Sequence, residues 1–152
     1  MKEGVLEDIP RKGVFIKKYS EREIQDLYDL REVTAGVSAR YAALNMTRRD
    51  LNSLESVYKK MELAVENHDN AAYVQCDLEF HEEIVKISGS TILSEIIANF
   101  NLRLNPINIV GIRNSEETIV EHRNIIDSLK RGNLEDAENV MRKHISRGKD
   151  VL

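Results

Sequence analysis

The sequence predicts an all-α fold, an antiparallel bundle of about six helices preceded by a short β-hairpin. At 152 residues the chain has the length of one domain, which buries about two thirds of its surface on folding. Only 7 Gly and 2 Pro are available for turns, whereas 32% of the residues are charged and 41% are apolar. This balance is typical of long amphipathic helices and argues against a many-turned β-sandwich or a disordered tail.

The N-terminal residues 4–17 have the pattern of a small β-hairpin. Residues 10–13, Pro-Arg-Lys-Gly, have turn chemistry, and the β-branched and aromatic residues 14–16 follow them. A two-stranded hairpin is marginally stable alone. We therefore expect it to lie against another part of the protein.

From Ser20 onward the apolar period becomes helical. Ser20 with Glu23, and Thr47 with Asp50, have the spacing of capping boxes and predict two helix starts. The first helix has a long apolar face, made of Ile24, Leu27, Leu30, Val37, Tyr41 and Leu44. The second has a stripe typical of a bundle seam, made of Leu51, Leu54, Tyr58, Met61 and Val65.

Four further helices follow the polar break at residues 67–70. The third is expected over about 71–87 and the fourth over about 91–104, ending before Pro106 because the residue preceding a proline avoids the α region. Residues 105–114 form an apolar connection. We expect Ser115 to cap a fifth helix reaching Arg131, with a Gly132-Asn133 turn into a sixth helix over about 134–149. Short links between six helices predict antiparallel packing.

Composition also excludes several classes of protein. The single cysteine, Cys76, rules out an internal disulfide framework. The sequence contains no run of about 18 uncharged apolar residues, the length that a membrane-spanning helix needs, and its N-terminus lacks the pattern of a secretory signal. A net charge of −4 argues against nucleic-acid binding by the chain as a whole, although residues 1–18 carry a small basic excess. We expect a cytoplasmic protein.

The most informative residues are polar side chains that interrupt the apolar rows of the helices. Three of the four histidines stand in such rows, and the fourth, His68, falls in a polar break. The rows are Val74, Leu78, His81 and Val85 on the third helix, Ile119, His122, Ile126 and Leu129 on the fifth, and Ala137, Met141 and His144 on the sixth. Asp77 lies four residues before His81 and therefore shares its face.

The spacing around the last turn predicts that two of these histidines meet. His122 lies eleven residues before Asn133, and His144 lies eleven residues after it. Eleven residues make about three helical turns, so both side chains fall on the facing sides of an antiparallel helical hairpin. A buried histidine without a partner costs on the order of 1–3 kcal/mol. Three buried histidines in one core therefore need a common binding partner that offsets this cost.

A divalent transition metal held by Asp77, His81, His122 and His144 meets this need. Imidazole nitrogens and one carboxylate oxygen suit zinc, nickel, cobalt, manganese or iron, and we expect zinc or nickel. The alternative is that each histidine forms separate hydrogen bonds within the core. Arg31 and Arg103 are candidates for pairing with an anionic ligand inside the bundle.

Two other function classes remain open on this reading. A metal-dependent enzyme would use the same centre to activate water, but it needs a general base, and no carboxylate outside the four residues is evidently placed on the inward rows. A purely structural helical interaction protein would leave the polar core residues merely hydrogen-bonded. We expect a protein that is not an enzyme.

Several stretches of the chain carry a resemblance to a known family. They are Tyr28 to Arg31, Ala42-Ala43, Asp77 to His81, Ser88-Gly89, Glu121 to Ile126 and Ala137 to Ile145. Over about residues 20–150 the sequence resembles the FCD domain, the C-terminal effector-binding and dimerisation domain of FadR-subfamily GntR transcription regulators. The resemblance implies that Asp77, His81, His122 and His144 hold the metal, that the effector is a small carboxylate, and that the protein is a homodimer.

The start of the chain resembles the end of the DNA-binding domain in such regulators. Residues 4–16 look like the wing hairpin of a winged-helix domain, without its recognition helix. The expected division is a wing remnant at residues 1–18, with Arg11 and Lys12 as DNA-contacting residues, and an FCD-like domain at 19–152. The resemblance then implies that operator DNA binds only to a form carrying the complete winged-helix domain.

Overall fold

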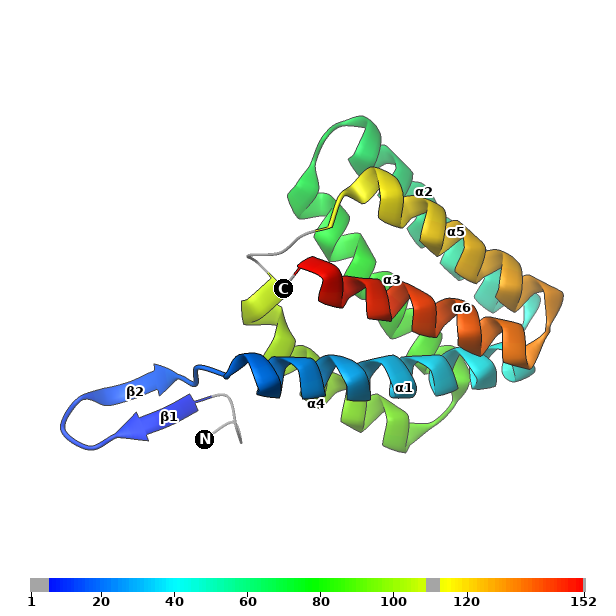
Figure 1. Ribbon diagram of the computed structural model, residues 1–152. Helices are drawn as coiled ribbons and strands as arrows, with labels where there is room; N and C mark the ends of the chain where they lie inside the picture. Colours follow the sequence, from blue (N-terminus) through cyan, green and yellow to red (C-terminus); the bar gives the residue numbers. More distant parts are fainter. Residues whose placement is uncertain (1–5, 109–112, 152) are drawn as a thin grey trace.

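The structure, a computed structural model, describes residues 6–108 and 113–151, which form a bundle of six α-helices with a β-hairpin at its N-terminal end (Figure 1). The elements are β1 (Leu6–Ile9), β2 (Gly13–Ile16), α1 (Glu21–Asn45), α2 (Arg48–Glu66), α3 (Asn70–Ser88), α4 (Thr91–Asn108), α5 (Ser115–Arg131), α6 (Leu134–Ser146) and a closing 3-10 helix, η1 (Arg147–Val151). The predicted fold class is confirmed.

The predicted hairpin is confirmed, but it does not lie against the helices as expected. β1 and β2 pair antiparallel, from Leu6 opposite Ile16 to Ile9 opposite Gly13. The turn closes through a hydrogen bond from the Lys12 amide to the Ile9 carbonyl at 2.9 Å. All four residues of β2 are exposed, and Figure 1 shows the hairpin extending away from the bundle at the start of α1.

The expected helix starts are confirmed at Ser20 and Thr47. The Ser20 hydroxyl accepts a hydrogen bond from the Glu23 amide, and the Glu23 carboxylate accepts one from the Ser20 amide. Thr47 forms the same reciprocal pair with the residue three positions later. The predicted N-cap of α5 is wrong by one residue, because Asn114 rather than Ser115 caps this helix. The Asn114 side chain accepts a hydrogen bond from the Glu116 amide at 2.9 Å.

Two helix ends differ from those expected. The fourth helix does not end at residue 104 but continues through Pro106 to Asn108. Pro106 has no amide to donate to the carbonyl of Leu102, so the helix continues past it with that one hydrogen bond missing. The sixth helix ends at Ser146, because the chain tightens there into η1. Part of the connection expected at 105–114, residues 109–112, lies outside the described residues.

The helices pack around a single apolar core. α1 packs against α6, α3 and α4, α2 packs against α3 and α5, and α5 packs against α6. The largest side chains without measurable exposure are Phe80, Leu54, Met61, Ile125, Ile126 and His122. The core therefore contains a histidine among its apolar side chains.

The apolar face predicted for the first helix is wrong in part, because Leu30, Tyr41 and Leu44 are 53%, 41% and 66% exposed. The residues of α1 that are buried are mostly small: Tyr28, Ala35, Gly36, Ser38, Ala39 and Ala42. A Cβ added at Gly36 would lie 2.5 Å from Cγ of Arg142 on α6. Small residues thus allow the close approach of α1 and α6, and part of the large apolar stripe faces outward.

Among the residues that the structure describes, no helix combines the length and the apolar content that crossing a bilayer requires.

Candidate metal centre

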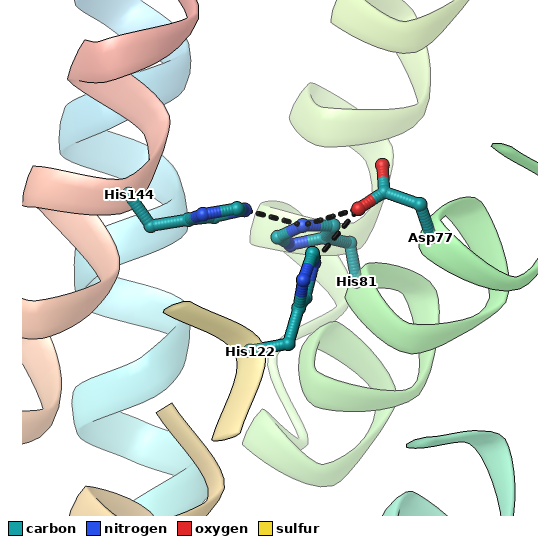
Figure 2. Close-up of side chains that lie close together, drawn as sticks. All are labelled: Asp77, His81, His122 and His144. Carbon is teal, nitrogen blue, oxygen red and sulfur yellow. Dashed lines mark hydrogen bonds and ion pairs between the residues drawn. The ribbon is translucent and has the colours of Figure 1, made fainter. Parts of the chain in front are cut away.

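Four side chains from three helices converge at one point in the bundle (Figure 2). Asp77 and His81 lie one turn apart on α3, His122 lies on α5 and His144 lies near the end of α6. One ligand atom from each of the four residues can be chosen so that all four lie within 4.8 Å of one another. The structure thus brings together the four residues named from the sequence.

The hairpin of α5 and α6 places two of the imidazoles side by side. Gly132 ends α5 in the left-handed conformation at φ 68°, and Asn133 caps α6 by accepting from the Asp136 amide at 3.0 Å. The ring centroids of His122 and His144 are 4.6 Å apart. Their equal distance from the turn therefore corresponds to proximity across the two helices.

His122 has a buried nitrogen that finds no hydrogen bond. The side chain is 0% exposed, and its Nδ1 lies 2.7 Å from the Thr118 carbonyl, to which it donates. A ring that carries its one proton on Nδ1 has its lone pair on Nε2. This atom has no hydrogen-bond partner among the described residues, yet it lies 2.8 Å from Oδ1 of Asp77. A nitrogen lone pair and a carboxylate oxygen this close together repel each other, and a cation that binds both atoms stabilises the arrangement.

The other two imidazoles complete the cluster. Nε2 of His81 lies 3.2 Å from Nε2 of His144 and 3.5 Å from Oδ1 of Asp77. Nitrogen and oxygen ligands at about 2.1 Å from one cation would be about 3.0 to 3.4 Å apart at neighbouring positions. The observed separations are close to these values, so the three imidazoles and the carboxylate fit a divalent transition-metal ion.

The protonation states at the centre suit metal binding. Burial lowers the pKa of His144 to about 3, and burial also lowers the pKa of His81, with a smaller contribution from the Arg31 charge. Burial raises the pKa of Asp77, but the neighbouring His81 and His122 outweigh it and leave the pKa well below its ordinary value. Neutral imidazole and ionised carboxylate are the ligating forms.

Glu121 is a buried carboxylate beside the centre that the sequence analysis missed. It is 7% exposed, and its Oε2 accepts a hydrogen bond from Nδ1 of His144 at 2.6 Å. The expectation that no further carboxylate lies on the inward rows is therefore wrong. A signal was present: Glu121 lies twelve residues before Asn133, so the count that pairs His122 with His144 also places it near that histidine.

The remaining candidate residues are more scattered. Arg31 is partly buried on α1, and its positive charge contributes to lowering the pKa of His81. Arg103 on α4 donates to the Asn99 side chain of the same helix at 2.8 Å. Arg11 and Lys12 are exposed at the tip of the hairpin, where Arg11 has a φ of 68°. Of these four residues, Arg31 is the one whose charge affects the pKa of a histidine in the cluster.

Comparisons with known proteins agree with this geometry at the level of the family. The family model described as the FCD domain matches residues 26–147. An uncharacterized HTH-type transcriptional regulator, YdhC of Bacillus subtilis (strain 168), is 22% identical over 95% of the chain and 66% of its own length. A probable D-xylose utilization operon transcriptional repressor of Paenarthrobacter nicotinovorans is 21% identical over 94% of the chain and 64% of its own length. The chain thus spans slightly less than two thirds of these curated relatives.

A solved structure shows the same fold. The chain superposes on Escherichia coli McbR/YncC with a TM-score of 0.86 at 20% identity, over 95% of this chain and 74% of that chain. The homologues and structural neighbours are GntR-family regulators rather than enzymes.

Proposed function

The chain belongs to the FCD domain family, and from this premise we propose that it is the ligand-sensing and dimerisation domain of a GntR-type transcription regulator. Its homologues are transcriptional regulators with FCD domains, which supports an effector-binding role. The finer parts of the proposal are a divalent metal, a small carboxylate effector, a homodimer and a cytoplasmic regulator.

The metal would be held by Asp77, His81, His122 and His144, with zinc or nickel as the expected ion. The observation that carries this proposal is Nε2 of His122, which is buried, without a hydrogen-bond partner in the described part of the chain and 2.8 Å from Oδ1 of Asp77. Separate hydrogen bonds for each histidine would leave this atom unsatisfied. That disfavours the alternative of a structural helical protein with an ordinary polar core.

The effector would be a small carboxylate that binds next to the four residues. A divalent cation supplies Lewis-acidic positive charge for carboxylate oxygens. Arg31 is the favoured second partner, because it is partly buried and its charge acts on His81. Arg103 is the weaker candidate, since its guanidinium already donates to Asn99.

Isothermal titration tests this pairing of metal and effector. Succinate and a panel of other small mono- and dicarboxylates are titrated into zinc-loaded protein and into protein treated with a chelator. We expect binding heat with the loaded protein and its loss after chelation. Arg31→Gln should weaken binding, whereas Arg49→Gln, at an exposed arginine of α2, should not. A carboxylate that binds equally well to the chelated protein would refute the pairing.

The dimer would form through the outward apolar stripe of α1. Leu30, Val33 and Leu44 on this helix are 53%, 46% and 66% exposed, and Ile92 on the adjoining α4 is 63% exposed. Large apolar side chains that gather on one face of a soluble protein mark an interaction site. GntR-family regulators usually act as dimers, which supports a second copy of the chain as the partner at this face.

DNA binding belongs to the proposal for the regulator as a whole. Residues 1–18 would contain the wing of a winged-helix domain, and residues 19–152 would be the FCD domain. Arg11 and Lys12, exposed at the hairpin tip, would then contact operator phosphates. Operator binding would need the complete winged-helix domain, and effector binding would control it by favouring one arrangement of two such domains.

No observation favours the enzyme alternative. The buried carboxylate nearest to the centre, Glu121, is occupied by hydrogen bonds from Arg113, Arg147 and His144. Burial raises the pKa of Glu121, but these hydrogen bonds outweigh it and leave the pKa below its ordinary value, so Glu121 is poorly suited to act as a general base. The homologues are regulators, which supports a protein that is not an enzyme.

A further inference from the structure

One buried carboxylate links the metal centre to two segments outside it. Glu121 on α5 accepts hydrogen bonds from three residues, His144, Arg113 and Arg147. Together, Glu121 and these three residues are called the Glu121 clasp. Arg113 lies two residues before α5, and Arg147 is the first residue of η1. The clasp therefore joins a histidine of the candidate centre to the chain on both sides of the α5–α6 hairpin.

The hydrogen bonds of the clasp occupy the carboxylate completely. Oε1 accepts from Nη2 of Arg113 at 2.8 Å and from Nη1 of Arg147 at 2.6 Å. Oε2 accepts from Nη1 of Arg113 at 2.8 Å and from Nδ1 of His144 at 2.6 Å. A carboxylate has about four acceptor positions, so all of them are filled. Rotation of the Glu121 side chain would break at least one of these bonds.

The clasp also determines which nitrogen of His144 is free. Arginine is always a donor and an ionised carboxylate only accepts, so the proton between Glu121 and His144 resides on Nδ1. The lone pair of the neutral ring is then on Nε2. That atom faces the cluster, 3.2 Å from Nε2 of His81.

We propose that Glu121 is the positioning residue of the metal centre, fixing the tautomer and the ring orientation of His144, and that Arg147 couples this position to η1. The inference rests on the proposed function, because it assumes that His144 binds a metal ion. A carboxylate behind a ligating histidine raises its basicity, and loss of such a partner costs about 10- to 100-fold in metal affinity.

The coupling extends through η1 to α1. Lys149 of η1 forms ion pairs with Asp29 and with Glu32 of α1, the latter at 3.2 Å. α1 is the helix that follows the β-hairpin directly (Figure 1). A continuous series of contacts therefore runs from His144 through Glu121, Arg147 and η1 to the N-terminal half of α1.

A double-mutant cycle with Co²⁺ tests the role of Glu121. In Glu121→Gln the amide oxygen can accept from the arginines only if its NH₂ group faces His144, which favours the tautomer with a proton on Nε2. The Co²⁺ affinity and visible absorption spectrum are measured for the native protein, Glu121→Gln, His144→Ala and the double variant. Glu117→Gln, at an exposed glutamate one turn earlier on α5, is the matched control.

We expect Glu121→Gln to lose about 10- to 100-fold in Co²⁺ affinity and to shift the absorption spectrum toward that of His144→Ala. In the His144→Ala background the same substitution should have little further effect, because its partner is gone. An equal loss in both backgrounds would show a merely structural role and overturn the proposal. A native protein that binds no Co²⁺ would overturn the metal proposal as well.

A second pair of variants tests whether Arg147 couples η1 to the metal centre. This test remains possible even if Glu121→Gln does not fold. Arg147→Gln leaves the Glu121 carboxylate in place, so it should weaken Co²⁺ binding by less than Glu121→Gln does. Arg131→Gln, at an exposed arginine of α5 that pairs with Asp136, should leave the affinity unchanged. Equal Co²⁺ affinities for Arg147→Gln and native protein, both folded by circular dichroism, would overturn the coupling to η1.

Discussion

His81 and His144 stack with their ring planes 13° apart and their Nε2 atoms separated by 3.2 Å, although they are 63 positions apart in the chain. Nδ1 of His144 donates to Glu121, so Nε2 of the neutral ring is an acceptor. The two nitrogens can share either one proton from His81 or a cation. The nearby Asp77 and His122 favour the cation, because they offer it two further ligand atoms.

His122→Ala should reduce zinc affinity by more than about 100-fold, because losing a ligand costs more than losing its hydrogen-bonded neighbour. Competition with a chromophoric chelator at fixed pH measures the change. His68→Ala serves as the control, since His68 is exposed in the turn between α2 and α3. A His122→Ala protein that keeps the native affinity would remove this residue from the ligand set.

The metal-free protein should lose stability as the pH falls below about 6.5, the ordinary histidine value. Burial lowers the pKa of His144 to about 3, and that of His81 in the same direction. The unfolded chain therefore takes up protons that the native protein does not, and the free energy of unfolding decreases with falling pH. The decrease is up to about 1.4 kcal/mol per pH unit for each histidine.

Urea unfolding of the metal-free protein at pH 7.5, 6.5 and 5.5 checks this dependence. The window lies above the range in which Asp77 and Glu121 titrate when unfolded, so their depressed pKa values do not contribute to it. His144→Gln should show a shallower dependence than the native protein. Stability that is constant or rises on acidification would contradict the prediction.

Gly36→Val should lower the free energy of unfolding by about 1–3 kcal/mol, the usual cost of overpacking. A Cβ at this position would lie 2.5 Å from Cγ and 2.9 Å from Cδ of Arg142. Arg142 is held by an ion pair with Glu32 at 3.3 Å, so its displacement also breaks that pair. Chemical denaturation measures the change. In an Arg142→Ala background the same substitution should cost clearly less, and an equal cost would point to a different clash.

Leu44→Glu should convert a dimer to a monomer, because it places a charge in the outward apolar stripe of α1, where Leu44 is 66% exposed. Sedimentation velocity over a range of protein concentrations measures the association. Leu63→Glu is the matched control, since Leu63 is 57% exposed on α2. If Leu63→Glu dissociates the dimer and Leu44→Glu does not, the interface lies on another face.

Local signals in the sequence predicted much of the fold. The capping pairs at Ser20 and Thr47 are short-range features, and the structure contains both. The proximity of His122 and His144 was also predictable, because a helical hairpin with one short turn converts equal spacing into contact. Each of these features depends on a few neighbouring residues or on one turn.

The sequence-based predictions fail where tertiary packing determines which side chains are buried and which residues meet. Leu30 and Leu44 have the period of a core face, but the sequence alone does not distinguish a face buried in the core from one that is exposed. Gly36 and its small neighbours bring α6 onto α1 instead. Glu121 was missed because a glutamate beside an apolar row is usually solvated, and its partners Arg113 and Arg147 meet it only in the folded chain.

The most direct test is anomalous X-ray scattering at the zinc and nickel absorption edges from crystals of the purified protein without an affinity tag. The metal proposal predicts one strong peak within about 2.0–2.2 Å of a carboxylate oxygen of Asp77 and of Nε2 of His81, His122 and His144. A peak held by other residues, or no peak in crystals grown with stoichiometric zinc or nickel, would contradict it.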